Sequence, residues 1–144
     1  MSVSLEVRDI FRRWIARADG HLEAARVLVR EGGPATFDAA CYHCHEAVAT
    51  LFKAALTLHG VVMPRVHDLE YLHRLLPEEH RFAASASDLS WLSTYGIERW
   101  WEPDAAQARR ALDVALTVRS AAGELFRCKV DPAAMCCFND GTSP

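Results

Sequence analysis

The chain has 144 residues, of which 51% are hydrophobic and 24% are charged, and this fits a single globular domain that can bury a core without disulfides or metal. Its net charge of -3 argues against a strongly electrostatic nucleic-acid binder, because phosphate contacts require a positive excess, and leaves open only a local basic strip at Arg8, Arg12, Arg13 and Arg17. No window approaches the roughly 18 uninterrupted apolar residues of a membrane span, and the N-terminal segment lacks the apolar run of a secretory signal, so we expect a cytoplasmic protein that makes no membrane contact.

Two long helices are predicted at the start of the chain. The first spans residues 4–30, and Gly32-Gly33-Pro34 ends it. The second runs from Thr36 to about His59, before Gly60 and Pro64 interrupt it. Its apolar residues recur at helical spacing and predict one stripe that faces a core. The opposite face then carries four polar side chains, namely His43, Glu46, Thr50 and Lys53.

Three further helices are predicted. Asp68 lies in the first turn of a short helix at 69–76, where a carboxylate complements the positive helix end, and Pro77 closes this helix. A weaker pattern places the core of the next helix at 87–99. The last helix is predicted at 103–126, since proline is tolerated in a first helical turn.

The pattern of these elements predicts an all-α protein. No segment shows the sustained alternation and β-branched enrichment of strands. Short connections place sequential helices antiparallel. We therefore expect an up-and-down antiparallel bundle of four long helices plus a short extra helix, forming one domain over residues 1–130 with an irregular tail at 131–144.

Cysteine and histidine in the second helix allow a zinc hypothesis. Cys41 lies one helical turn from both Cys44 and His45, and thiolate and imidazole both suit zinc. However, Cys41 and Cys44 fall on the apolar stripe, and free cysteine is among the most buried residue types. We favour structural cysteines and predict no cofactor. The odd count of five cysteines also argues against a secreted disulfide framework.

Three segments occur in an order that is similar to a known family. They are EAVATLFKA at 46–54, VHDL at 66–69 and RWWEP at 99–103. They resemble the Q-A-x-E-K-x-x-K-A core, the THDL-like turn and the RYP-like element of the HEPN family, which are small prokaryotic helical bundles often encoded beside minimal nucleotidyltransferases. The resemblance implies a helical bundle, a homodimer and a possible minimal nucleotidyltransferase partner, and it spans roughly Trp14 to Phe126.

The chain also departs from this family. Ala49-Thr50 replaces the central Glu-Lys pair, and Trp100-Trp101 follows Arg99 in place of the tyrosine. Family members that cleave RNA as toxins carry an Arg-x4-6-His signature near the start of the last helix. Counted from Arg99, the histidine would fall at Asp104, Ala105 or Ala106, so the signature is missing there. Arg74 and His80 do have the spacing of the signature, but so short a motif is expected to match by chance. Pro77 also lies between them and separates them at a helix end.

Arg99, Trp100 and Trp101 are the strongest functional candidates outside the second helix. Arginine can bind phosphate bidentately, and indole rings can stack on bases, so the three could hold a nucleotide or single-stranded RNA. The alternative is a homodimer interface, for which tryptophan and arginine are preferred anchors. We favour the interface for Trp100 and Trp101. For Arg99, a ligand groove and an ion pair with Glu98 or Glu102 both stay open.

Four more residues are candidates for the same ligand or RNA groove. His67 and Asp68 could form an acid/base or RNA-contacting pair at a helix N-terminus, although capping of that helix is the commoner role. Glu46 and Lys53 lie two turns apart on one helix face and could line the groove, or they could simply be solvated.

Three functional hypotheses follow in order of preference. The first is a HEPN-like interaction module without RNase activity, which contacts a nucleotide, RNA or a partner nucleotidyltransferase. The second is a metal-independent endoribonuclease toxin of a toxin-antitoxin pair, in which Arg99 acts with a histidine from elsewhere, such as His67 or His43. The third is a zinc-binding helical protein built on Cys41, Cys44 and His45.

Overall fold

The computed structural model describes residues 3–78, 81–82, 84–96 and 102–129, and these residues form helices without any strand. The helices are α1 (Leu5–Glu31), α2 (Pro34–Leu58), α3 (Leu69–Leu75), α4 (Ala86–Ser93), the 3-10 turn η2 (Thr94–Gly96) and α5 (Ala105–Lys129). The predicted all-α fold is confirmed. The predicted tail at 131–144 lies outside the described residues.

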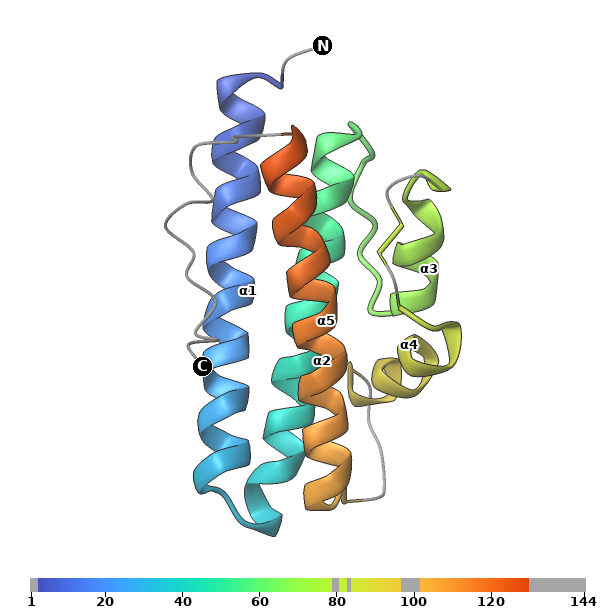
Figure 1. Cartoon of the computed structure of the whole chain (residues 1–144). Helices are drawn as coiled ribbons and strands as arrows, with labels where there is room; N and C mark the ends of the chain where they lie inside the picture. Colours follow the sequence, from blue (N-terminus) through green and yellow to red (C-terminus); the bar gives the residue numbers. More distant parts are fainter. Residues whose placement is uncertain (1–2, 79–80, 83, 97–101, 130–144) are drawn as a thin grey trace.

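The long helices α1, α2 and α5 run side by side, and the short helices α3 and α4 lie beside them (Figure 1). α1 and α2 are antiparallel, as the short connection between them predicts. α5 runs in the same direction as α2, because the segment with α3 and α4 takes the chain back along the bundle. α2 contacts every other helix, including η2. It is therefore the central element of the fold.

Capping side chains set several of the helix ends. Ser4 accepts a hydrogen bond from the backbone N–H of Val7 at 3.3 Å and begins α1. Asp104 and Gln107 form a reciprocal pair at the start of α5, in which each side chain accepts from the other residue's backbone N–H, at 2.8 and 2.9 Å. This capping box explains why α5 begins at Ala105 rather than at Pro103.

The fourth helix is shorter than its predicted core at 87–99. α4 ends at Ser93, and the Thr94 hydroxyl donates to the carbonyl of Trp91 at 2.7 Å while the backbone tightens into η2. This early end matters for packing, because it directs Gly96 against α2. Residues 97–99 lie outside the described residues.

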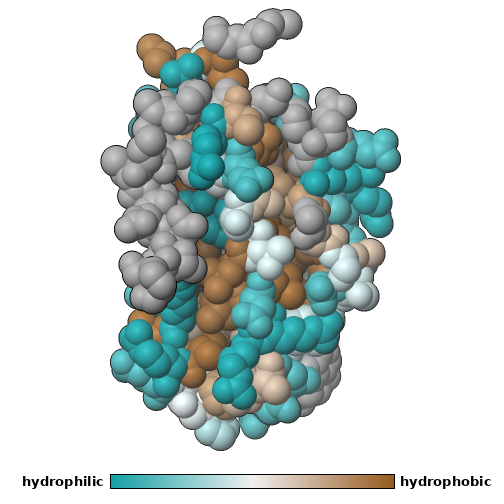
Figure 2. All heavy atoms as spheres, in the orientation of Figure 1, coloured by the Kyte–Doolittle hydropathy of each residue, from teal (hydrophilic) through white to brown (hydrophobic). Residues whose placement is uncertain are grey.

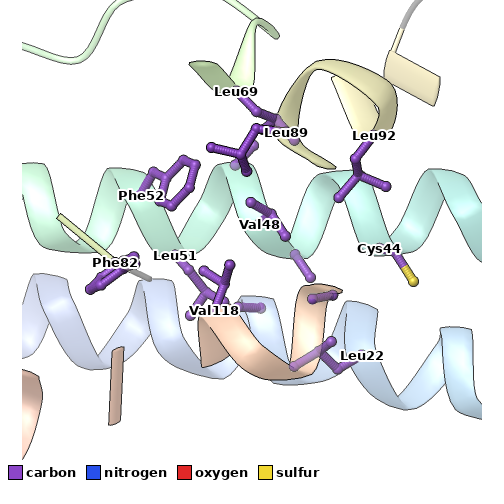
Figure 3. Packing of buried hydrophobic residues seen from close by; sticks show 14 of the residues in the cluster. Leu22, Cys44, Val48, Leu51, Phe52, Leu69, Phe82, Leu89, Leu92 and Val118 are labelled. Atoms are coloured by element: carbon purple, nitrogen blue, oxygen red, sulfur yellow. The ribbon is translucent and has the colours of Figure 1, made fainter. Parts of the chain in front are cut away.

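The core surrounds α2 on more than one face. In Figure 3, Leu69, Leu89 and Leu92 point toward α2 from the short helices, while Leu22 and Val118 lie on the other side of it. The central part of α2 is consequently buried all around, and even the polar Thr50 is only 5% exposed. The prediction that Thr50 belongs to a polar face is wrong, because α3 and α4 cover the side of α2 that faces away from α1.

On the face seen in Figure 2, apolar atoms form a strip between α1 and α5, and hydrophilic side chains border it. An ion pair connects the same two helices: Arg119 Nε donates to Asp19 Oδ1 at 2.6 Å, and Arg119 Nη2 donates to Oδ2 at 3.3 Å. Arg119 is 8% exposed, so this bidentate pair is largely shielded from water. None of the described helices combines the length and the apolar character that a membrane span requires.

Asp68 caps α3, and its replacement should have a measurable cost. Its Oδ1 accepts from the Tyr71 backbone N–H at 3.1 Å. We expect Asp68→Ala to lower the free energy of unfolding by about 1 kcal/mol, as loss of an N-cap typically does. Urea unfolding measures this change. Asp9→Ala is the control, because its carboxylate lies 3.7 Å from Arg12 in an exposed pair and should have little effect. Equal losses in both variants would contradict the capping role.

Candidate functional site

His45 is a fully buried histidine in the middle of α2, and both of its ring nitrogens have partners. Nε2 lies 2.9 Å from the carbonyl oxygen of His67, and Nδ1 lies 3.3 Å from Glu46 Oε1. A carbonyl and a carboxylate both accept hydrogen bonds, so the two contacts are satisfied together when the ring carries two N–H donors. Hydrogen-bond acceptors therefore hold the His45 ring at both of its nitrogens.

Gly96 of η2 packs directly on the His45 ring. A Cβ atom built at Gly96 would overlap three atoms of the imidazole, namely Cε1, Nε2 and Nδ1. The close approach is possible only because glycine has no side chain. η2 therefore holds the ring from one side, while the carbonyl of His67 fixes its orientation through Nε2.

Glu46 lies among three histidines. The hydrogen bond from His45 lowers the pKa of the Glu46 carboxyl, and burial opposes this by raising it. The charges of His45, His21 and His67 lower it further. The carboxylate is thus held in its ionised form inside a group of imidazoles. We call His21, His43, His45, His67 and Glu46 the histidine cluster.

A direct contact between two histidines joins α1 to α2 in this cluster. His21 Nδ1 lies 2.9 Å from His43 Nδ1, and the two rings are tilted by 40°. Both side chains are partly buried. Burial is the largest cause that lowers the pKa of His21, followed by the charge of His43, while Glu46 raises it. The neutral form of His21 is therefore favoured.

The predicted groove residues have different positions in the structure. Glu46 and His67 come together in the histidine cluster, with the His67 ring centroid 6.1 Å from that of His45. Asp68 is exposed beside them and caps α3. Lys53 is partly buried two turns further along α2, and it is not among the groups whose charges shift the Glu46 pKa. Arg99, Trp100 and Trp101 lie outside the described residues.

The cysteines of α2 behave as core residues. Cys41 and Cys44 are fully buried, and neither forms a disulfide. Burial raises the pKa of the Cys41 thiol to about 11, although a hydrogen bond with Tyr95 opposes the rise, and burial raises the pKa of Cys44 to about 12. Both therefore stay protonated, whereas zinc binds thiolate. Among the described residues, no group of three or more His, Cys, Asp or Glu side chains could hold a metal ion.

The positions where an RNA-cleaving relative would carry its histidine form the start of α5. Asp104 accepts from the Gln107 backbone N–H as an N-cap, and Ala105 and Ala106 begin the helix. None of these side chains can act as an imidazole acid or base.

A separate hollow of about 320 Å³ lies between the start of α4 and α5, lined by Ala84, Ser85, Asp88, Arg110, Asp113, Val114 and Thr117. Arg110 donates to Asp88 at 2.8 Å and lies 4.2 Å from the centroid of the Trp91 ring. The hydrogen bond from Arg110 is the main cause that lowers the pKa of Asp88. The one arginine of this hollow is thus already paired with a carboxylate, so the histidine cluster is the better candidate site.

Acid should destabilise the protein through this cluster. The folded-state pKa of His21 is lowered from its ordinary value of 6.5, and that of Glu46 from 4.5. Each group therefore binds its proton more readily in the unfolded chain, and its stabilising contribution is lost as pH falls through its folded-state value. As the pH is lowered, we expect the urea midpoint to fall first below pH 6.5, through protonation of His21, and then further below pH 4.5, through protonation of Glu46. Glu46→Gln should remove part of the second loss, and an unchanged acid profile would contradict this assignment.

The HEPN domain family model matches residues 11–125. This segment includes all of α2, α3 and α4 and most of α1 and α5. No curated protein and no solved structure matches the chain. The resemblance predicted from the second helix, the VHDL turn and the RWWEP segment is confirmed, and the chain belongs to the HEPN domain family.

Proposed function

We propose that this HEPN domain is a cytoplasmic, homodimeric binding module that contacts RNA or a nucleotide without cleaving RNA. The absence of catalysis is supported by the start of α5, where a capping aspartate and two alanines occupy the positions of the family's histidine. A general acid or base must reach the proton that it transfers, and these side chains offer no imidazole there. This observation carries the proposal.

The ligand surface that we propose is the exposed side of the histidine cluster, together with Asp68, Lys53 and Arg99. The His67 ring is exposed and can stack on a base. The Glu46 carboxylate is ionised and partly exposed, and it can accept a hydrogen bond from an exocyclic amine. With a net charge of -3, base contacts should dominate over phosphate contacts.

Fluorescence anisotropy with a short labelled single-stranded RNA, and in parallel with labelled ATP, tests the binding surface. We expect His67→Ala to weaken binding roughly fivefold to tenfold, as loss of one stacking ring does. This variant keeps the backbone carbonyl that binds His45. His59→Ala is the matched control, because His59 lies at the C-terminal end of α2, away from the cluster.

Three outcomes would contradict the proposed function. The first is that neither RNA nor ATP binds the wild-type chain. The second is that the His67 and His59 variants bind equally well. The third is RNA cleavage in EDTA that Arg99→Ala abolishes, which would favour the endoribonuclease hypothesis instead.

A minimal nucleotidyltransferase is the protein partner that we propose, and the tryptophans at 100 and 101 are the proposed anchors of the homodimer. Tryptophan at such a site would be a major source of binding energy. Analytical ultracentrifugation of the wild type and Trp100→Ala measures the dimer, and a monomeric wild type would contradict it. Copurification with the product of a neighbouring nucleotidyltransferase gene measures the partner contact.

A further inference from the structure

The contact between His21 and His43 has a chemical restriction that most side-chain contacts lack. Two Nδ1 atoms 2.9 Å apart form one hydrogen bond, in which one nitrogen donates and the other accepts. The accepting nitrogen must be free of hydrogen, so at least one of the two rings must be neutral. When both rings are protonated, two N–H donors of like charge face each other and the bond is lost.

The charged groups around the pair come from both helices that meet there. His43 and Glu46 act on His21 from α2, and Arg17 acts on it from α1 itself, one turn away. Arg17 and a protonated His43 both disfavour a positive charge on His21. The single negative charge of Glu46 can compensate for only one of the positive charges around it. His45 already forms a hydrogen bond with the Glu46 carboxylate. Double protonation of the pair is consequently costly in the folded state.

We propose that the His21–His43 pair is a pH-sensitive switch between α1 and α2, closed while at least one ring is neutral and open when both rings are protonated. α1 makes most of its helix contacts with α2 and few with α5. Opening therefore loosens the middle of α1, close to Asp19 and its ion pair with Arg119. The switch goes beyond the proposed ligand binding and does not depend on it.

Hydrogen exchange of the full chain at several pH values tests the switch. After correction for the intrinsic pH dependence of exchange, we expect α1 amides around His21 to exchange roughly tenfold faster at about pH 5.5 than at about pH 7.5. Amides in the middle of α5 should change much less. Nitrogen-15 NMR of the histidine rings in the same samples reports when both rings of the pair become protonated.

His21→Gln is the informative variant, because an amide can donate to or accept from His43 and has no charge to gain. Its α1 exchange should be nearly independent of pH, whereas the control His59→Gln should retain the wild-type response. The proposal is overturned if the wild type shows both rings protonated with α1 protection unchanged, or if His21→Gln keeps the full pH response. If His21→Gln fails to fold, the comparison of ring protonation with α1 protection in the wild type decides alone.

Discussion

Gly96→Ala is expected to lower the free energy of unfolding by about 1–3 kcal/mol, the usual cost of forcing an extra methyl group into a packed site. The new Cβ would overlap the His45 ring, which is fully buried and held through both nitrogens. The ring cannot move away without losing its contact with the His67 carbonyl or with Glu46. Alternatively η2 must shift, which would disturb Tyr95 in the core. Chemical denaturation measures the loss.

Gly20→Ala is the matched control for this substitution. Gly20 lies inside α1, and a Cβ there has nothing within 4 Å. Alanine is the better helix former, so we expect Gly20→Ala to stabilise the protein by about 0.5–1 kcal/mol. The two glycine substitutions should therefore have opposite signs. A destabilisation of similar size in both variants would contradict the packing of η2 on His45.

Asp19→Ala is expected to destabilise the protein by about 2–4 kcal/mol, somewhat below the cost of breaking a fully buried pair because the aspartate is partly exposed. The side chain of Asp19 is 32% exposed, whereas that of Arg119 is 10% exposed. The substitution removes two charge-assisted hydrogen bonds that the largely buried Arg119 guanidinium makes at the α1–α5 contact.

A double variant separates this cost from a simple loss of packing. Asp19→Ala combined with Arg119→Met removes both charges and keeps an apolar side chain between the helices. We expect it to recover a large part of the stability lost in Asp19→Ala, because replacing both partners of a shielded pair costs less than removing one. If the double variant were less stable than Asp19→Ala by the full cost of a second core substitution, the explanation by charge would be wrong.

The long helices could be predicted closely from the sequence because their signals are local. Glycine and proline at 32–34 separate α1 from α2, and apolar spacing gives their extents to within a few residues. α4 was harder to predict, because its end depends on the Thr94 hydroxyl and on packing of Gly96 against α2. The burial of Thr50 could not be predicted from the apolar pattern of α2 alone, because it depends on α3 and α4 packing over α2.

The candidate site was predictable only in part. Glu46 and His67 could be chosen from the family resemblance, and the structure brings them into one cluster. His21 was missed because its partner His43 is 22 positions away along the chain and the contact depends on how α1 and α2 align. The contact could have been suggested by aligning the two predicted antiparallel helices and asking which polar residues then face each other. Gly96 gave no such signal, because its role depends on its neighbours in space.

We propose that this HEPN domain binds RNA or a nucleotide without cleaving RNA. The most direct measurement follows one end-labelled single-stranded RNA with the wild-type protein in EDTA, by anisotropy and by denaturing gel on the same sample. We expect a stable anisotropy increase that His67→Ala weakens, while the RNA stays full length. RNA that is shortened in proportion to protein and time, with cleavage lost in Arg99→Ala, would contradict it.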